Sequence, residues 1–223
     1  MREIVLDTET TGLDPDEGHR IVEVACVELM NHLPTGRHFH CYVNPQRPVA
    51  SEAAAIHGLT DAFLAQQAPF AAVIDELLGF IGDAPLVIHN AEFDLRFLNA
   101  ELRRLERPAL ACAFTDTLAL AKRRFPGAPA SLDALCRRFA IDLSAREKHA
   151  AKLDCELLAA VYLELVGGRQ PGFDLMAADG AASRTAVDRP VRPPRPHAAS
   201  AAELAAHAAF LEKLKNPLWR AGA

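Results

Sequence analysis

The pattern of apolar and polar positions begins with strands and continues with alternating helices and strands. Apolar, partly β-branched runs separated by short polar segments predict three strands: residues 3–8, 20–30 and 38–43. In the second run, apolar and acidic side chains alternate through Glu23 and Glu28, which is typical of a strand.

Helical spacing dominates the next part of the chain, interrupted by two short strands. Pro69 opens the main helix of a mostly helical stretch over residues 51–81. A buried strand at residues 85–89 leads into a long amphipathic helix that Pro108 stops. Another strand-like run ends near Phe114, and three helices follow: from Asp116 toward Phe125, from the N-cap Ser131, and from about His149 to Val166. This order predicts an α/β fold, a mixed sheet flanked by helices.

The character of the chain changes after Arg169. Residues 169–199 are rich in proline and alanine and lack apolar periodicity, which predicts a flexible linker. A capping box formed by Ser200 and Glu203 then opens a short C-terminal helix. The predicted organisation is therefore a globular domain over residues 1–168, the linker, and a C-terminal segment over residues 200–223.

Composition narrows the class of protein. Half of the residues are hydrophobic, which is enough for a real core, and the net charge of −5 gives no broad basic field. A polyanionic substrate would have to be neutralised locally, by bound cations. The five cysteines form no C-x-x-C pair, which favours a reducing compartment over disulfides or zinc. We see no leader peptide and no membrane-spanning run, so we expect a cytoplasmic protein without a membrane partner.

Asp7 and Glu9 stand two residues apart at the end of the first predicted strand. Alternate side chains of a strand point to one face, so both carboxylates project toward one small volume. Like charges held this close repel each other unless a cation lies between them. Oxygen ligands of this kind suit Mg²⁺ or Mn²⁺, so the pair predicts a divalent-metal site. Taken alone, such a pair also fits a solvated strand end.

Asp94, His149 and Asp154 are further candidates downstream. Asp94 lies in the first turn of a helix that follows a buried strand, where an isolated acid would only interact with the helix dipole. His149 and Asp154 are five residues apart, which on a regular helix separates them by about 140°. They converge only if His149 precedes the helix that contains Asp154. An imidazole titrates near neutrality, which suits a general base.

Three motifs together resemble those of the DEDD exonucleases, in the branch that carries a histidine: Asp7-Thr8-Glu9-Thr10-Thr11-Gly12, Asn90-x-x-Phe93-Asp94 and His149-x-Ala151-x-x-Asp154. Other segments are similar, more narrowly, to the proofreading subunits of bacterial replicative DNA polymerases: Val87-Ile88-His89-Asn90, Ser131-Leu132-Asp133-Ala134-Leu135-Cys136 and Leu218-Trp219-Arg220-Ala221. The resemblance implies a ribonuclease H-like fold and an exonuclease domain over residues 1–168.

The resemblance also implies a reaction. Mispaired nucleotides would leave a DNA 3′ end one at a time as nucleoside 5′-monophosphates, through hydrolysis assisted by two divalent cations, Mg²⁺ or Mn²⁺. By analogy the metal ligands are Asp7, Glu9, Asp94 and Asp154, and His149 is the general base.

Substrate contacts follow from the same resemblance, which implies the set Asp7, Glu9, Thr10, Glu52, His57 and Asp154. Alone, Glu52 fits a helix-start acid and His57 a loop residue before a glycine turn. Asp116 fits an N-cap better than a residue that supports the metal ligands.

The C-terminal part suggests partners. Trp219 lies beyond the linker, and the resemblance implies that residues 200–223, with Leu211 and Trp219, bind the catalytic (alpha) subunit of the polymerase. Gln170, Phe173 and Leu175 lie within residues 170–175, which resemble a sliding-clamp-binding peptide, although chance explains that match equally well. Two other functions stay open: a DEDD-type exoribonuclease, and a non-catalytic tether between polymerase and clamp.

Overall fold

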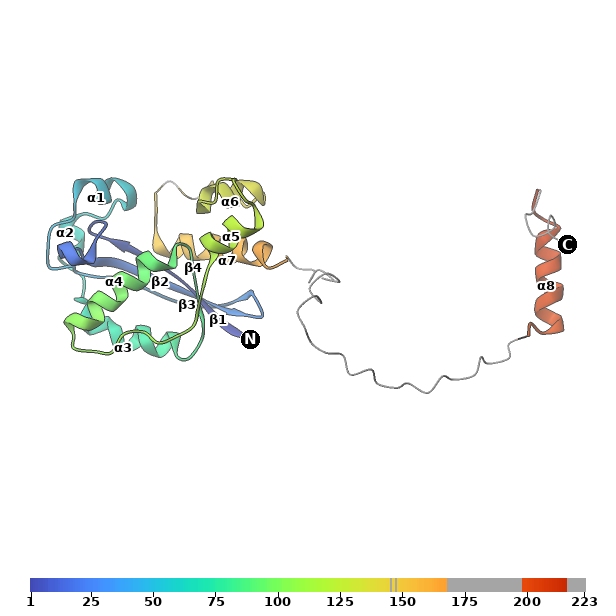
Figure 1. The fold of residues 1–223 in the computed structure, drawn as a ribbon, viewed down its shortest axis with the longest axis horizontal. Coiled ribbons are helices and arrows are strands. Elements are labelled where there is room, and N and C mark those ends of the chain that lie inside the picture. The colour runs from blue at the N-terminus through green and yellow to red at the C-terminus, as the bar shows by residue number, and fades with distance from the viewer. Residues whose placement is uncertain (145, 147, 168–197, 216–223) are drawn as a thin grey trace. The chain divides into compact units, whose positions relative to one another are not determined.

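The computed structural model describes residues 1–144, 146, 148–167 and 198–215 (Figure 1). The chain divides into two units, residues 1–173 and 174–223. The partner-binding candidates Gln170, Phe173, Leu175 and Trp219 lie outside the described residues, so their roles and the predicted domain boundaries stay predictions.

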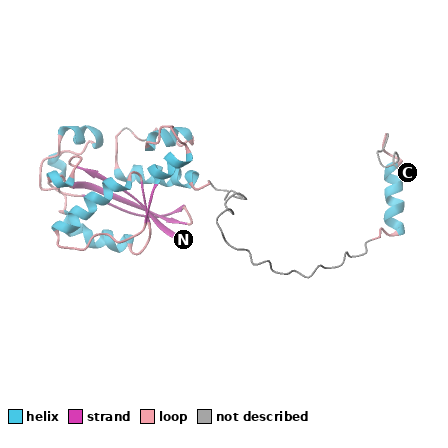
Figure 2. Ribbon diagram, in the orientation of Figure 1, coloured by secondary structure: helices cyan, strands magenta, loops and turns pink. Residues whose placement is uncertain are grey.

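The first unit contains one five-stranded sheet in the order β3-β2-β1-β4-β5 (Figure 2). The strands are β1 (Arg2–Thr10), β2 (Ile21–Met30), β3 (Leu33–Tyr42), β4 (Leu86–Ile88) and β5 (Phe114–Asp116). The pairs β1–β2 and β2–β3 are antiparallel, whereas β1–β4 and β4–β5 are parallel. This confirms the predicted mixed sheet.

The helices that accompany the sheet are α1 (Ser51–His57), α2 (Asp61–Leu64), α3 (Phe70–Ile81), α4 (Ala91–Arg104), α5 (Thr117–Arg124), α6 (Leu132–Arg138) and α7 (Ala151–Leu165), with a 3-10 helix at Pro15–Glu17. Ser131 is the N-cap residue of α6, as predicted, and its side chain accepts a hydrogen bond from the Ala134 backbone. Pro69, predicted to open its helix, lies at the N-cap position just before α3. None of the described helices is long and apolar enough to cross a membrane.

Two apolar layers cover the two faces of the sheet, and β1 shows how its sequence divides between them. Ile4 and Leu6 pack with residues of α3 and α4. Val5, between them, packs with residues of α5, α6 and α7. Alternate side chains of a strand point to opposite faces, so the odd-numbered positions of β1 face α7. This parity positions the candidate site.

One strand begins earlier than predicted, and the predicted strand over residues 20–30 is present but buried on both faces. β3 begins at Leu33 rather than at residue 38, because it is an edge strand whose first six residues are exposed and need no apolar alternation. The alternation in β2 does not separate a wet face from a dry one: Glu23 and Glu28 are both buried, because helices cover both faces of the sheet. Each pairs with a partly buried basic side chain, His40 and Arg2 respectively.

The second unit contains one described helix, α8 (Ala201–Leu211). The predicted capping box is present: the Ser200 hydroxyl accepts from the Glu203 backbone, and the Glu203 carboxylate accepts from the Ser200 backbone. Leu204 is exposed and Leu211 is only partly buried within the described residues.

Candidate active site

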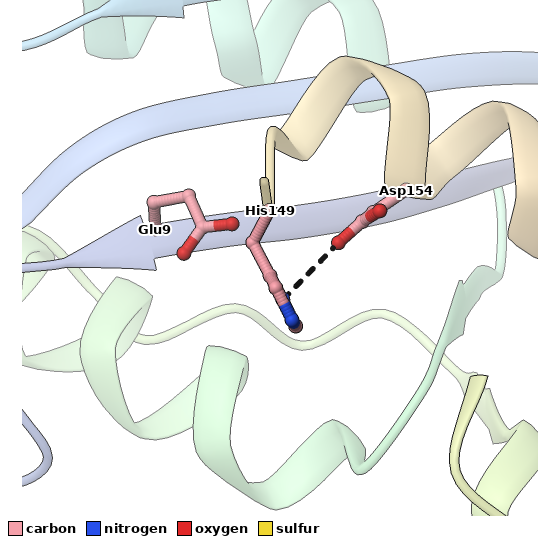
Figure 3. A group of neighbouring side chains, drawn as sticks. All are labelled: Glu9, His149 and Asp154. Atoms are coloured by element: carbon pink, nitrogen blue, oxygen red, sulfur yellow. Dashed lines mark ion pairs between the residues drawn. The ribbon is translucent and has the colours of Figure 1, made fainter. Parts of the chain in front are cut away.

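The candidate site lies where the carboxyl end of β1 meets the start of α7. Asp7 and Glu9 share the parity of Val5 and therefore face α7. Asp154 lies in the first turn of α7 and is buried. Figure 3 shows Glu9 at the end of its strand, with Asp154 reaching toward the same space from the helix. Strand parity and helix packing thus bring acids from opposite ends of the domain together.

His149 lies just before α7, which begins at Ala151 and not at His149 as predicted. This shift allows the convergence that a regular helix would forbid. The ligand atoms of Glu9, His149 and Asp154 all lie within 4.8 Å of one another, and His149 Nδ1 is 3.5 Å from Asp154 Oδ2 (Figure 3). The His149 backbone N–H donates to the Ile56 carbonyl at 3.3 Å, which ties this loop to α1.

Asp94 enters from the other side of the sheet, through the junction of β4 and α4. Asn90 adopts a left-handed conformation with φ of 66°, which asparagine tolerates better than most residues, and so turns the chain sharply into α4. Asp94 follows in the first turn and is buried. The Thr8 hydroxyl donates to Asp94 Oδ1 at 2.7 Å, so β1 fixes the orientation of this carboxylate.

The acids of the site hold their protons unusually tightly. Burial raises the pKa of Glu9 to about 8, and the neighbouring Glu23 carboxylate adds to that rise. Burial likewise raises the pKa of Asp94 to about 7. It raises the pKa of Asp7 well above its ordinary value, with contributions from the Asp94, Glu9 and Asp154 charges. The site therefore carries more negative charge than its surroundings stabilise.

Glu23 contributes to this excess through the register of the sheet. Glu9 and Glu23 are direct cross-strand partners on β1 and β2, and cross-strand partners lie close together on one face. Glu23 pairs with His40, whose Nε2 lies 2.7 Å from Glu23 Oε1.

Arg146 supplies positive charge inside the site. Its guanidinium donates to both carboxylate oxygens of Asp154, from Nε at 2.5 Å and from Nη2 at 2.7 Å. It also donates to Asp133 and approaches His149. Sequence reasoning missed Arg146, and missed the Thr8 hydrogen bond to Asp94. A basic side chain three residues before His149 was the available signal for Arg146.

The predicted metal ligands and base line one cleft of about 540 Å³, together with Thr8, Leu13, His89, Asn90, Phe93, Ser131, Leu132, Asp133 and Arg146. The predicted substrate residues Thr10, Glu52 and His57 line a neighbouring cavity of about 410 Å³. Glu9, Thr8, Leu13 and Phe93 line both. The sequence candidates within the described domain therefore lie in two adjoining hollows.

The structure shows where Asp116 and His57 lie, two residues whose roles the sequence left open. Asp116 is the N-cap of α5 and accepts from the Leu118 backbone at 2.9 Å, as its default interpretation predicted. His57 is not a loop residue: it ends α1 and is buried, and Gly58 follows with φ of 77°. Burial lowers the pKa of His57, which favours the neutral imidazole.

The donor set fits divalent cations. Carboxylate oxygens are the ligands that Mg²⁺ and Mn²⁺ prefer. No side-chain hydrogen bond or ion pair from the part of the chain that the structure describes reaches Asp7 or Glu9. Carboxylates that lie close together, partly buried and unneutralised, are stabilised when cations bind to them.

Comparison with known proteins places the chain among nucleases. The Exonuclease (RNase_T) family matches residues 4–162. The chain is 51% identical over 180 residues to DNA polymerase III subunit epsilon of Rickettsia conorii, covering 79% of this chain and 78% of the relative. It is 42% identical over 237 aligned positions to the subunit of that name from Escherichia coli, covering 99% and 98% of the two chains.

A solved structure supports the fold. The nuclease domain of 3′hExo, a DEDDh family member, superposes with a TM-score of 0.63 at 18% identity, covering 74% of this chain and 91% of that one. At this identity the likeness concerns the fold alone, and it confirms the ribonuclease H-like architecture that the motifs implied.

Proposed function

The chain belongs to the exonuclease family, and from that premise we propose that it is the proofreading subunit of a bacterial replicative DNA polymerase. It removes mispaired nucleotides from DNA 3′ ends. The observation that carries the proposal is the convergence of Asp7, Glu9, Asp94, His149 and Asp154 on one cleft. The near full-length similarity to a subunit named for DNA polymerase III supports the DNA substrate and the polymerase complex. Its place would then be the cytoplasm, where bacterial DNA is replicated.

The nuclease is dependent on divalent metal, and we assign its site to two cations, Mg²⁺ or Mn²⁺. Asp7, whose charged neighbours include Asp94, Glu9 and Asp154, would help to hold both. Glu9 and Asp154 would complete one position, and Asp94, oriented by Thr8, would hold the other. When bound, the ions make water more acidic and neutralise the charge that develops on the departing oxygen.

The chain's own residues then handle the proton and the strand end. His149 is half exposed at the mouth of the cleft, where its imidazole reaches solvent water. It accepts a proton as the water oxygen bonds to phosphorus and the bond from phosphorus to the 3′-oxygen of the preceding nucleotide breaks. The products are a nucleoside 5′-monophosphate and a shortened strand with a free 3′-hydroxyl.

The neighbouring cavity suits the terminal nucleotide. Glu52 offers a carboxylate that accepts from the 3′-hydroxyl, and it is exposed and available. His57 and the half-exposed Ile56 present an apolar surface against which a base can stack. Thr10, at the end of β1, connects this cavity to the acids. Asp7, Glu9 and Asp154 would hold the cations that neutralise the scissile phosphate.

The decisive experiment compares single-stranded DNA and RNA of one sequence, each labelled at the 5′ end, with Mn²⁺ present. We expect stepwise shortening of the DNA from its 3′ end with release of mononucleotides. His149→Gln, purified in the same way, controls for contaminating nucleases. Faster shortening of RNA would instead support the exoribonuclease, and no hydrolysis of either strand would support the non-catalytic tether.

The C-terminal segment requires its own test. We propose that residues 200–223 bind the alpha subunit and that residues 170–175 contact the sliding clamp. The exposed Leu204 and partly exposed Leu211 of α8 support a helix that packs against another protein. Trp219→Ala should reduce co-purification with the alpha subunit and leave hydrolysis of free DNA unchanged. Clamp binding that survives Gln170→Ala with Phe173→Ala would remove the second contact.

A further inference from the structure

Arg146 is paired with Asp154, one of the carboxylates that the proposed metal site requires. Its Nε and Nη2 groups donate to the two different oxygens of Asp154 at 2.5 and 2.7 Å, the fork geometry that makes such pairs strong. The side chains of Arg146 and Asp154 are only 7% and 4% exposed, so water screens the pair little. The contact with Asp154 raises the pKa of the guanidinium further, so it stays charged.

The same guanidinium also engages the proposed base. Nη2 of Arg146 lies 3.0 Å from His149 Nδ1 and 3.4 Å from His149 Nε2. A nitrogen at nearly equal distances from both ring nitrogens lies across the ring and not in line with the lone pair of either one. The guanidinium therefore packs against the imidazole while it pairs with Asp154.

A divalent cation and this guanidinium compete for one place. Two positive groups bound to a single buried carboxylate repel each other strongly at a separation of about 4 Å. Glu9, His149 and Asp154 lie close enough to share a cation, and Arg146 already donates to both carboxylate oxygens of Asp154. Binding of the ion therefore requires Arg146 to move.

Two features allow that movement. Arg146 lies between α6 and α7, where no helix fixes its backbone. Its Nη1 also donates to Asp133, near the start of α6, whose side chain is 41% exposed. Asp133 can keep the guanidinium paired when it leaves Asp154, so the movement does not strand a charge in the protein interior.

We propose that Arg146 is the resident counter-cation of the metal-free site: it pairs with Asp154 until a divalent ion displaces it, and so lowers the affinity for metal. The inference rests on the proposed metal site. It makes Arg146 a positioning residue that acts through Asp154.

The test is a calorimetric titration of the full chain with Mn²⁺, together with thermal melts with and without the ion. Arg146→Gln removes the competing charge but keeps a side chain of similar length. We expect its Kd for Mn²⁺ to fall about tenfold, which corresponds to about 1.4 kcal/mol. Its metal-free Tm should fall, because Asp154 loses its partner, so the rise in Tm on adding Mn²⁺ should exceed that of the natural protein.

Arg20→Gln is the matched control. Arg20 forms the same fork with buried Glu101, at 2.6 and 2.7 Å, and neither residue lines the cleft or the adjoining cavity. It should lower the Tm with and without Mn²⁺ and leave the Kd unchanged. Arg146→Lys keeps the charge and loses the fork, so its Kd should lie between those of the natural protein and Arg146→Gln. This variant carries the test if Arg146→Gln does not fold.

The outcomes separate this inference from the proposed function. Binding of Mn²⁺ by the natural protein with an equal or weaker affinity in both Arg146 variants would overturn the inference and leave the metal site intact. No binding in any of the proteins would overturn the metal site, and the inference with it. Equal tightening by Arg20→Gln would show that loss of any buried ion pair suffices, and would also overturn the inference.

Discussion

Buried acids occur in two regions of this domain, and the two regions treat them in opposite ways. In the body of the fold, Glu101 accepts a fork from Arg20, and Glu28 accepts from Arg2 at 2.6 Å and from Arg37 at 2.9 Å. The hydrogen bonds from Arg2 and Thr35 lower the pKa of Glu28. Buried charges of this kind are stabilised by the partners that the fold provides.

The acids at the carboxyl end of β1 do not have such partners among the described residues. Asp7 and Glu9 receive no side-chain hydrogen bond from the described residues, and burial raises both of their pKa values. Glu28 and Glu101 each have an arginine partner, and Asp7 and Glu9 have no comparable partner in the part of the chain that the structure describes. Partly buried acids without a partner cost stability, and their gathering in one cleft therefore indicates a site that a cation completes.

Asp154 is intermediate between the two regions. It lies in the cleft, yet Arg146 pairs with it as Arg20 pairs with Glu101. The difference lies in the surroundings: Asp154 adjoins Glu9 and His149, whereas Glu101 lines neither the cleft nor the adjoining cavity. The neighbours of a buried ion pair thus distinguish the two cases. The Arg20–Glu101 pair only stabilises the fold, whereas a metal ion can replace Arg146 beside Asp154.

The largest expected effect comes from removing a cleft acid. Asp7→Asn should lower kcat at least about a thousandfold, because the amide cannot balance the charge of the cations. The same change should raise the metal-free stability at pH 8, because an amide does not have to ionise in a buried place. Nucleotide release and urea denaturation measure the two effects. A variant that keeps full activity would contradict the assignment of Asp7.

Glu101→Gln should show the opposite pair of effects. Removing one partner of the buried fork leaves Arg20 uncompensated, so we expect the free energy of unfolding to fall by about 3 kcal/mol. The folded protein should keep its kcat, because Glu101 does not line the cleft. Urea denaturation and the nuclease assay, run below the unfolding transition, check both. A large loss of kcat in fully folded protein would erase the contrast between the two regions.

The pH dependence should show the smallest effect. The pKa of Glu9 is about 8 in the folded protein against 4.5 ordinarily, and that of Asp94 about 7 against 3.8. The folded state therefore binds more protons than the unfolded state in this range, and stability, complete below about pH 4, is lost as the pH rises toward 8. We expect a loss of about 2 kcal/mol without metal, because water still screens part of the charge of Glu9.

Saturating Mg²⁺ should remove most of this loss, because the cation stabilises the ionised acids. Thermal melts from pH 5 to 8, with Mg²⁺ and with a chelator, make the measurement. Profiles that coincide under both conditions would mean that the acids of the cleft do not bind the ion.

The helices, the strands and the candidate acids could be identified from the amino-acid sequence alone. Apolar spacing identified the strands and most helices, because one buried face imposes a local period, and cap residues such as Ser131 act within a single turn. The motif spacing identified Asp7, Glu9, Asp94, His149 and Asp154 as a set. Their convergence on one cleft follows from the parity of β1 and the starts of α4 and α7, which are local features.

The pairing of the charged side chains, in contrast, depends on the tertiary structure. Arg20 and Glu101 are 81 residues apart, and no local period connects them. The burial of Glu23 and Glu28 depends on helices that cover both faces of the sheet, which the alternation in β2 cannot reveal. The fork from Arg146 to Asp154 depends on the path of the chain between α6 and α7. Side-chain pairing is set by packing over long distances, so the sequence identified the acids and the fold determined which of them stay unpaired.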